Sequence, residues 1–285
     1  MAKRTVSQIL SAFLMNSYVR GFSEGTIYRG KLKSVCLPVL NCYSCPGAVG
    51  SCPVGSLQSV AAGYIFNFSF YAAGIIGLTG IIFGRFLCGW VCPFGLIQDL
   101  LHRVPSPKYN LPGRLRYVKY IVLLLPVLIL PALLSDPAGL GVPYFCKWLC
   151  PAGTLEAAIP LYFVMPSIRT SLGLLFSWRL LWLGLLVAFA IFFRRGFCRV
   201  LCPLGAFYSL FNRFSFFSMS VDLSKCIACD ACQKSCYASI PVYNEPNHPE
   251  CTRCLECVKN CPAGAIKWNA PSLGCKKKAL ASGHF

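Results

Sequence analysis

The cysteines of this chain fall into closely spaced groups, and the clearest pattern lies near the C-terminus. Two runs there share the spacing C-x2-C-x2-C-x3-C; they are Cys226, Cys229, Cys232 and Cys236, then Cys251, Cys254, Cys257 and Cys261. Such short gaps let three thiolates wrap one cubane cluster while the fourth reaches its neighbour. The spacing therefore predicts two [4Fe–4S] clusters, with these ligands: Cys226, Cys229, Cys232 and Cys261 for one, and Cys251, Cys254, Cys257 and Cys236 for the other. A zinc site or disulfides are the alternative, and two complete tandem copies argue against it.

Three further cysteine pairs share a spacing of four residues and end in proline. They are Cys88 and Cys92, Cys146 and Cys150, and Cys198 and Cys202. A spacing of four predicts two thiols one turn apart on one helical face. Because a cubane needs four thiolates, two pairs must combine. The distribution of basic residues puts the first and third pairs on the cytoplasmic side, which predicts a cluster at the inner membrane face held by Cys88, Cys92, Cys198 and Cys202.

The remaining pair, Cys146 and Cys150, falls on the outer side, where its available partners are Cys36, Cys42, Cys45 and Cys52. Two of these partners would complete a fourth cluster. The Cys-Pro-x-Gly pattern that begins at Cys52 recurs in each of the three pairs, which favours Cys52, with Cys45 or Cys42 as the other ligand. In a rival arrangement the four loop cysteines form one set, and the pair is a disulfide or redox-active. Structural disulfides in an oxidising compartment are the plainest alternative.

The elements that must position these cysteines are strongly apolar. Hydrophobic residues make up 56% of the 285 residues and charged residues 13%, against about 25% charged in an average soluble domain. Long apolar stretches lie at residues 6–19, 60–83, 118–134 and 172–193. A hydrocarbon core about 30 Å thick requires about 20 apolar residues in a helix. We therefore expect about four transmembrane helices, the first short and uncleaved and the third kinked at Pro126 and Pro131.

Basic residues indicate the orientation of these helices. The loop at 85–119 and the C-terminal part are rich in Lys and Arg, so the positive-inside rule places both in the cytoplasm. The loops at 20–58 and 136–170 then lie outside. The expected fold is an all-α membrane bundle of two pseudo-repeated halves (1–213), a small α+β two-cluster domain (214–270) and a basic tail (271–285) with a free thiol at Cys275. This predicts a multi-pass protein of the inner (cytoplasmic) membrane.

The net charge of +18 narrows the range of partners. In a soluble protein it would suggest nucleic acid. Here the basic residues flank apolar stretches and no nucleic-acid motif accompanies them. We therefore expect the lipid bilayer as a partner and no nucleic acid.

The motifs together resemble those of the membrane polyferredoxins typified by NapH, the C-terminal part of NosR and CcoG. The matching stretches are R-F-L-C-G-W-V-C-P-F-G at 85–95, G-F-C-R-V-L-C-P-L-G at 196–205 and the two C-terminal runs. The resemblance covers about residues 60–265, and it implies four membrane helices, a cytoplasmic ferredoxin domain and electron transfer near the quinone pool. Tyr237 stands where such runs usually carry proline. The cysteines at 36–52 and 146–150 are additional, and they suggest an outward-facing redox site.

These features predict transmembrane electron transfer through a chain of four [4Fe–4S] clusters, with no catalytic residue of its own. The donor would be a cytoplasmic or quinone-level partner and the acceptor a redox protein outside. The alternatives are a quinol dehydrogenase or metal-ion reductase subunit, and an iron–sulfur or metal maturation factor. His102, beside Trp90 and Asp99 near the inner membrane surface, is a candidate to line a quinone site; an ordinary interfacial histidine is the plainer interpretation.

Overall fold

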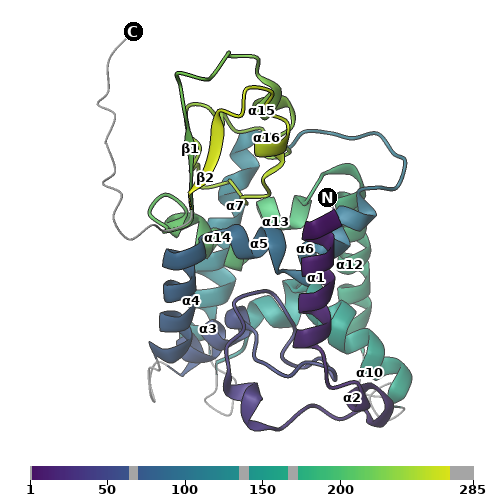
Figure 1. Ribbon diagram of the computed structural model, residues 1–285. Helices are drawn as coiled ribbons and strands as arrows, with labels where there is room; N and C mark the ends of the chain where they lie inside the picture. Colours follow the sequence, from purple (N-terminus) through teal and green to yellow (C-terminus); the bar gives the residue numbers. More distant parts are fainter. Residues whose placement is uncertain (1, 64–69, 135–140, 166–172, 270–285) are drawn as a thin grey trace.

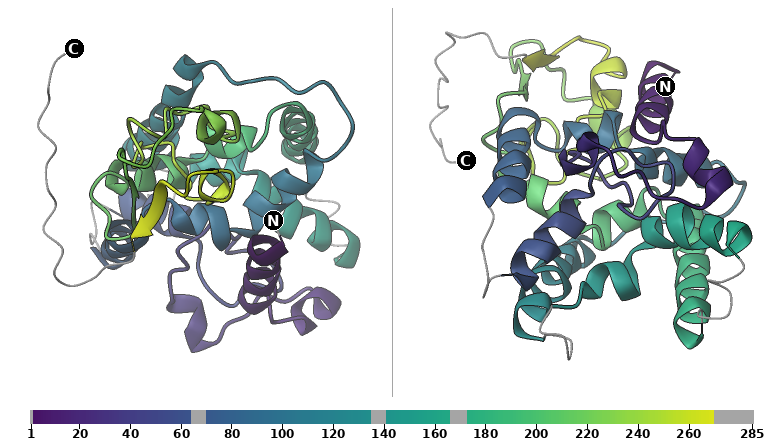
Figure 2. Two further views of the ribbon diagram at one scale, coloured as in Figure 1. Left: turned by 45° about the horizontal axis from the view of Figure 1, so that its top comes forward. Right: turned by 90° about the horizontal axis from the view of Figure 1, so that it is seen from below.

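The computed structural model describes residues 2–63, 70–134, 141–165 and 173–269. The predicted basic tail, including Cys275, lies outside these ranges, as does part of the predicted span at 60–83. The described chain is mostly helical, as expected, with one short two-stranded sheet. Figures 1 and 2 show a bundle of helices with a small module covering one of its ends.

The bundle is built from helices that run between the module and the opposite end (Figure 1). These are α1 (Ala2–Met15), α4 (Phe70–Phe83), the continuous series α7 (Val118–Val122), η3 (Leu123–Ile129) and α8 (Leu130–Leu133), and α12 (Leu174–Phe192). The segments Gly113–Leu133 and Leu174–Phe192 are long and apolar enough to cross a membrane, and Tyr71–Phe83 is a shorter apolar helix. Among the described residues, helix length and composition therefore support the expected spans at 118–134 and 172–193. The other two spans remain predictions.

Pro126 changes the helix type without ending the helix. It lies inside the π-helical segment η3, which continues directly into α8. Proline lacks an amide N–H and its ring clashes with the preceding turn. A wider π turn accommodates both effects, so the helix changes its winding at Pro126, where the sequence predicted a kink.

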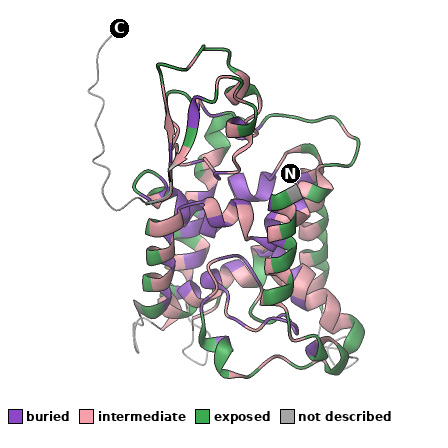
Figure 3. Ribbon diagram, viewed as in Figure 1, coloured by how far each residue is buried: buried purple, intermediate pink, exposed green. Residues whose placement is uncertain are grey.

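Short helices fill the space between the long ones. On the side of the module they are α5 (Phe86–Trp90), α6 (Pro93–Leu101), η2 (Gly113–Tyr117), α13 (Gly196–Val200) and α14 (Pro203–Phe211). Toward the opposite end they are α2 (Arg20–Glu24), η1 (Lys31–Ser34), α3 (Pro53–Ala62), η4 (Phe145–Leu149), α9 (Pro151–Gly153), η5 (Thr154–Ala158) and α10 (Ile159–Val164). Figure 3 shows that buried residues concentrate among the short inner helices, whereas the long outer helices are largely half-buried or exposed.

The covering module is the C-terminal part of the described chain. Strand β1 (Ser218–Val221) pairs antiparallel with β2 (Ile266–Asn269), and the helices α15 (Ala231–Lys234) and α16 (Glu256–Lys259) lie between them in sequence. Its small apolar core consists of Met219, Ala238, Ile240, Val242, Cys257 and Ile266. Two short helices and one two-stranded sheet bury little apolar surface, so this module depends on other sources of stability.

Candidate iron–sulfur centres

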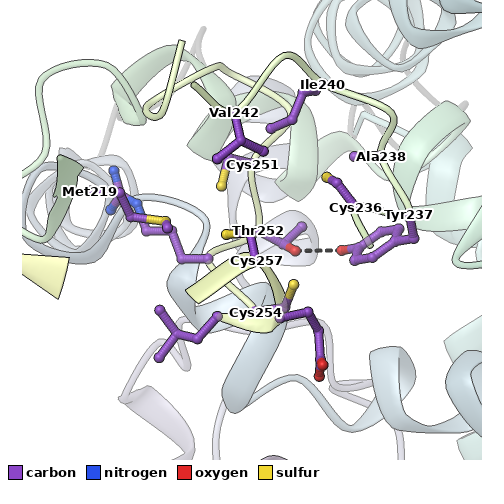
Figure 4. Close-up of a pocket in the computed structure, with 13 residues that line it drawn as sticks. Met219, Cys236, Tyr237, Ala238, Ile240, Val242, Cys251, Thr252, Cys254 and Cys257 are labelled. Atoms are coloured by element: carbon purple, nitrogen blue, oxygen red, sulfur yellow. Dashed lines mark hydrogen bonds between the residues drawn. The ribbon is translucent and has the colours of Figure 1, made fainter. Parts of the chain in front are cut away.

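The first cysteine group lies in the module, on the side that faces the bundle. Cys236, Cys251, Cys254 and Cys257 line one cavity, together with Met219, Ile240 and Val242 (Figure 4). The lining also includes Tyr237, Thr252, Arg253 and Glu256. We call this set the proximal site.

The second group in the module lies nearer the solvent. Cys226, Cys229, Cys232 and Cys261 line a separate and larger cavity, and Cys229 is exposed. We call this set the distal site.

The backbone around both module sites suits a negatively charged cluster. Ala228 and Asp230 flank Cys229 with φ of 51° and 55°, and Arg253 and Leu255 flank Cys254 with φ of 51° and 62°. Left-handed residues that alternate with ordinary ones turn successive amides toward one point and form an anion-binding nest. Accordingly, the Arg253 amide donates to the Cys251 sulfur and the Glu256 amide to the Cys254 sulfur. The residues present therefore fit an anionic iron–sulfur cluster.

A third group lies in the bundle, where α5, α6, α13 and α14 meet. Cys88, Cys92, Cys198 and Cys202 line one buried cavity with Phe94, Leu204 and the loop residues Pro38, Val39 and Leu40. Cys92 and Cys202 each precede a helix that begins with proline, and the Gly205 amide donates to the Cys202 sulfur at 3.4 Å. The sulfur thereby takes the place of an N-cap oxygen, which stabilises negative charge on it. We call this set the inner site.

The prediction that each Cys-x3-Cys pair lies on one helical face was wrong. Cys88 is in α5, but Cys92 has extended backbone (φ −67°, ψ 116°) and α6 begins only after it. The same break separates Cys198 in α13 from Cys202. A residue before proline avoids the helical region because it would clash with the proline ring. The broken helix directs the two thiols of each pair toward one cavity.

Two arginines join the halves of the inner site reciprocally. Arg85, three residues before Cys88, donates to the Cys198 carbonyl at 3.3 Å, and Arg195, three residues before Cys198, donates to the Cys88 carbonyl at 3.0 Å. Both arginine side chains are fully buried. Burial raises the pKa of the Cys88 thiol, and the two guanidiniums oppose that effect. Buried cations in this position offset the negative charge that a cluster and its thiolates would bring.

The fourth group lies on the side of the bundle away from the module. The pKa of the Cys150 thiol is raised mainly by burial. The neighbouring thiols Cys146, Cys42 and Cys52 raise it further. Burial, followed by Cys52, raises the pKa of Cys146 to about 12. These four thiols are therefore close neighbours in a buried environment, and we call them the outer site. Glu156 accepts a hydrogen bond from the Cys42 amide at 2.7 Å, and burial raises the pKa of this carboxyl to about 7.

Cys36 and Cys45 are both buried, and their sulfurs have other contacts. The sulfur of Cys45 is near Asn16 Oδ1, at 3.7 Å, and that of Cys36 faces Ser51 and Ser56. The two alternatives left open by the sequence, Cys42 and Cys45, are thus distinguished by position, and Cys42 is the one beside the pair. Iron binding at all these residues stays a prediction.

The sequence pattern did not single out two glutamines that serve equivalent roles. Gln58 Nε2 donates to the Cys146 sulfur at 3.0 Å and Gln98 Nε2 donates to the Cys198 sulfur at 2.9 Å. Each glutamine lies six residues after the cysteine of a Cys-Pro-x-Gly motif. An alignment of the repeated motifs on that cysteine places both glutamines at the same position. Each amide crosses from the first half of the chain to a thiol of the second half.

We expect the Gln98→Leu variant to lower the reduction potential of the inner site. The amide hydrogen bond favours the more negative, reduced state, and leucine of similar size removes it, so the shift should be on the order of tens of millivolts. An EPR-monitored redox titration measures the potential. Gln8→Leu is the matched control, because Gln8 is equally buried but donates to the Cys92 carbonyl rather than to a sulfur. An equal shift in both variants would assign the effect to burial alone.

The described ranges contain no three His, Cys, Asp or Glu side chains that converge as the ligands of a single metal ion do. A cubane is several atoms wide and requires its thiolates farther apart than a mononuclear ion does. Four thiols around a cavity, as at the proximal, distal and inner sites, fit the larger group better than zinc.

Close backbone packing brings the proximal and inner sites together. A Cβ placed on Gly89, next to Cys88, would lie 2.5 Å from the carbonyl oxygen of Thr252, which follows Cys251. Trp90 Nε1 donates to the Arg253 carbonyl at 3.0 Å. Tyr237, which stands where proline was expected, packs its ring 5.8 Å from the Arg195 guanidinium carbon.

We expect Gly89→Ala to separate the module from the bundle, because the carbonyl at 2.5 Å is backbone and cannot rotate away. Faster proteolysis of the module and faster hydrogen exchange at the Trp90 indole would report the change. Gly77→Ala in α4 is the control, since nothing described lies within 4 Å of its added methyl. Equal protection in both variants would show that the contact at Gly89 is dispensable.

His102 has an ordinary structural contact. Its Nδ1 lies 3.1 Å from the Ile191 carbonyl oxygen near the end of α12. The Trp90 indole bonds to the Arg253 carbonyl of the module. A quinone at His102 stays an untested prediction.

Comparisons with known proteins agree with this chemistry. The family model described as a 4Fe–4S binding domain matches residues 64–112, 121–159 and 174–220. An uncharacterised protein of Methanocaldococcus jannaschii is 30% identical over 70% of this chain and 71% of its own length. The putative electron transport protein YccM of Escherichia coli is 30% identical over 83% of this chain and 68% of its own length.

The regulatory protein NosR of Stutzerimonas stutzeri is 29% identical over 60% of this chain, which corresponds to 22% of the length of NosR. No solved structure matches the chain. The family model, these relatives and the cysteine motifs all agree, and the chain belongs to the 4Fe–4S ferredoxin-type proteins related to NapH and NosR.

Proposed function

We propose that the chain carries electrons across a membrane through four [4Fe–4S] clusters, held at the distal, proximal, inner and outer sites. The observation that carries this proposal is the succession of four groups of four cysteines, from the exposed Cys229 through the module and bundle to the far side. Each cluster, when bound, can accept and release one electron. The relatives named as electron transport and ferredoxin-type proteins support the same chemistry.

The outward faces of the long helices support a position in the lipid bilayer. Apolar side chains there are widely exposed, among them Leu133 at 74%, Leu174 at 91% and Leu181 at 59%. Exposed apolar belts on this scale require a lipid or protein covering. Arg114, Arg116 and their basic neighbours near the module favour a cytoplasmic module and a multi-pass arrangement in the inner membrane. We propose the division into a membrane domain (1–213) and a ferredoxin-like domain (214–270) on the same grounds.

The chain's own residues provide position and charge balance. Broken helices fix the thiols of the inner site, and buried Arg85 and Arg195 compensate negative charge there. Gln58 and Gln98 adjust the electron density on particular sulfurs. Apolar packing excludes water, which limits the reorganisation that each change of charge requires. The partners would be redox proteins on one or both membrane faces.

Iron and sulfide analysis of anaerobically purified protein, combined with an EPR redox titration, tests the cofactor content. Four clusters give about 16 iron atoms per chain, and all four should reduce and reoxidise. Labile or substoichiometric iron would contradict the proposal and favour a maturation factor. Quinol oxidation by the chain alone would instead indicate a quinol dehydrogenase.

A further inference from the structure

The loop between Cys36 and Cys42 contributes residues to the buried core of the bundle. Val39, Leu40 and Asn41 are each 1% exposed. The loop is held at both ends, because the Leu37 amide donates to the Ser51 carbonyl at 2.9 Å and the amide groups of Asn41 and Asn16 bond to each other at 3.2 Å. In its middle, the Tyr208 hydroxyl donates to the Pro38 carbonyl at 2.8 Å. A segment fixed this firmly presents its peptide groups in one orientation.

This loop touches both sites of the bundle. Pro38, Val39 and Leu40 line the cavity of the inner site, and Cys42 belongs to the outer site. The Leu40 amide donates to the sulfur of Cys92, an inner-site thiol. The next amide along the chain, that of Asn41, donates to the sulfur of Cys52, an outer-site thiol.

We infer that the backbone of Leu40 and Asn41, with its two successive amides, is the bridge that couples the inner and outer sites electronically. Two N–H···S bonds from successive amides, linked through the Leu40 Cα, put the Cys92 and Cys52 sulfurs about 10 Å apart or less. The connecting path consists of covalent and hydrogen bonds, with no lipid or water in between. The inference rests on the proposed function, since it assumes that both sites hold clusters. It adds that these two clusters are immediate neighbours inside the bundle and do not lie at opposite membrane faces.

Magnetic coupling tests this arrangement on the intact chain. Two reduced clusters at such a separation should broaden or split each other's EPR signals. The Cys150→Ala variant removes an outer-site thiol, so the inner-site signal should become narrower while the two ferredoxin signals remain. If the fully loaded protein has four clusters and the inner-site linewidth is the same in Cys150→Ala, the inference fails and the proposed function stands. If the wild-type protein lacks the membrane clusters altogether, the proposed function itself fails.

A second pair of variants tests the peptide bridge directly. Leu40→Pro removes the amide that donates to Cys92, whereas Val39→Pro alters the neighbouring residue, whose amide donates to no sulfur in the described contacts. After rapid photoreduction, equilibration between the inner and outer sites should slow several-fold in Leu40→Pro and remain near the wild-type rate in Val39→Pro. Equal rates with full cluster content would overturn the bridge. If Leu40→Pro fails to load iron, the linewidth comparison with Cys150→Ala still decides.

Discussion

Replacing Glu250 with glutamine is expected to lower the free energy of opening between the module and the bundle by about 3–5 kcal/mol. Glu250 Oε2 accepts from Arg85 at 2.8 Å, and Oε1 accepts from Lys119. All three side chains are buried. Burial opposes ionisation of Glu250, but the two cations outweigh it and lower the pKa of this carboxyl to about 2. Glutamine would leave two buried cations without an anion, which costs far more than the loss of a surface pair.

Native-state hydrogen exchange at the interface measures this opening. Glu245→Gln is the matched control, because its carboxylate is 63% exposed and lies 3.9 Å from His248. An exposed pair of this kind is worth about 0–1 kcal/mol. Comparable losses in the two variants would show that the buried triad does not hold the module on the bundle.

Cys42→Ser should remove the outer cluster, with a loss of about four iron atoms per chain. Cys42 is the loop thiol that lies beside Cys52, Cys146 and Cys150, and serine is a poor substitute for a thiolate ligand. Cys45→Ser is the matched control in the same loop, since Cys45 is also buried but its sulfur lies near Asn16 Oδ1. Iron analysis and EPR of both variants measure the effect.

The opposite pattern, with iron lost in Cys45→Ser and kept in Cys42→Ser, would contradict the assignment of the outer site. Loss of iron in both variants, with Cys146→Ser unchanged, would instead support the rival set formed by the loop cysteines alone. Each arrangement therefore has its own signature in the same three variants.

Spacing alone indicated which thiols of the two ferredoxin runs belong together. Cys236 and Cys261 are each the last cysteine of one run but line the cavity formed by the other run. The exchange is predictable because gaps of two residues allow three thiols to surround one centre and leave the fourth pointing away. Because the spacing is a local feature, it predicts this grouping of thiols without knowledge of the tertiary fold.

Other parts of the site could not be predicted because they depend on contacts between distant segments. Nothing in the spacing separates Cys42 from Cys45; the position of Glu156 and of the paired Asn16 and Asn41 decides which thiol faces Cys146. The triad around Glu250 joins residues 165 and 131 positions apart in sequence. The prediction that Cys88 and Cys92 share one helical face failed for a local reason. Pro93 keeps the preceding residue, Cys92, out of the helical region.

The most direct test of the account is electron transfer across a sealed vesicle that contains the purified, iron-loaded chain. Impermeant titanium(III) citrate outside would serve as the donor and trapped ferricyanide inside as the acceptor. We predict chain-dependent reduction of the trapped ferricyanide, which Cys42→Ser abolishes and Cys45→Ser leaves intact. A protein whose clusters all reduce while the trapped ferricyanide stays oxidised would contradict the proposed conduit.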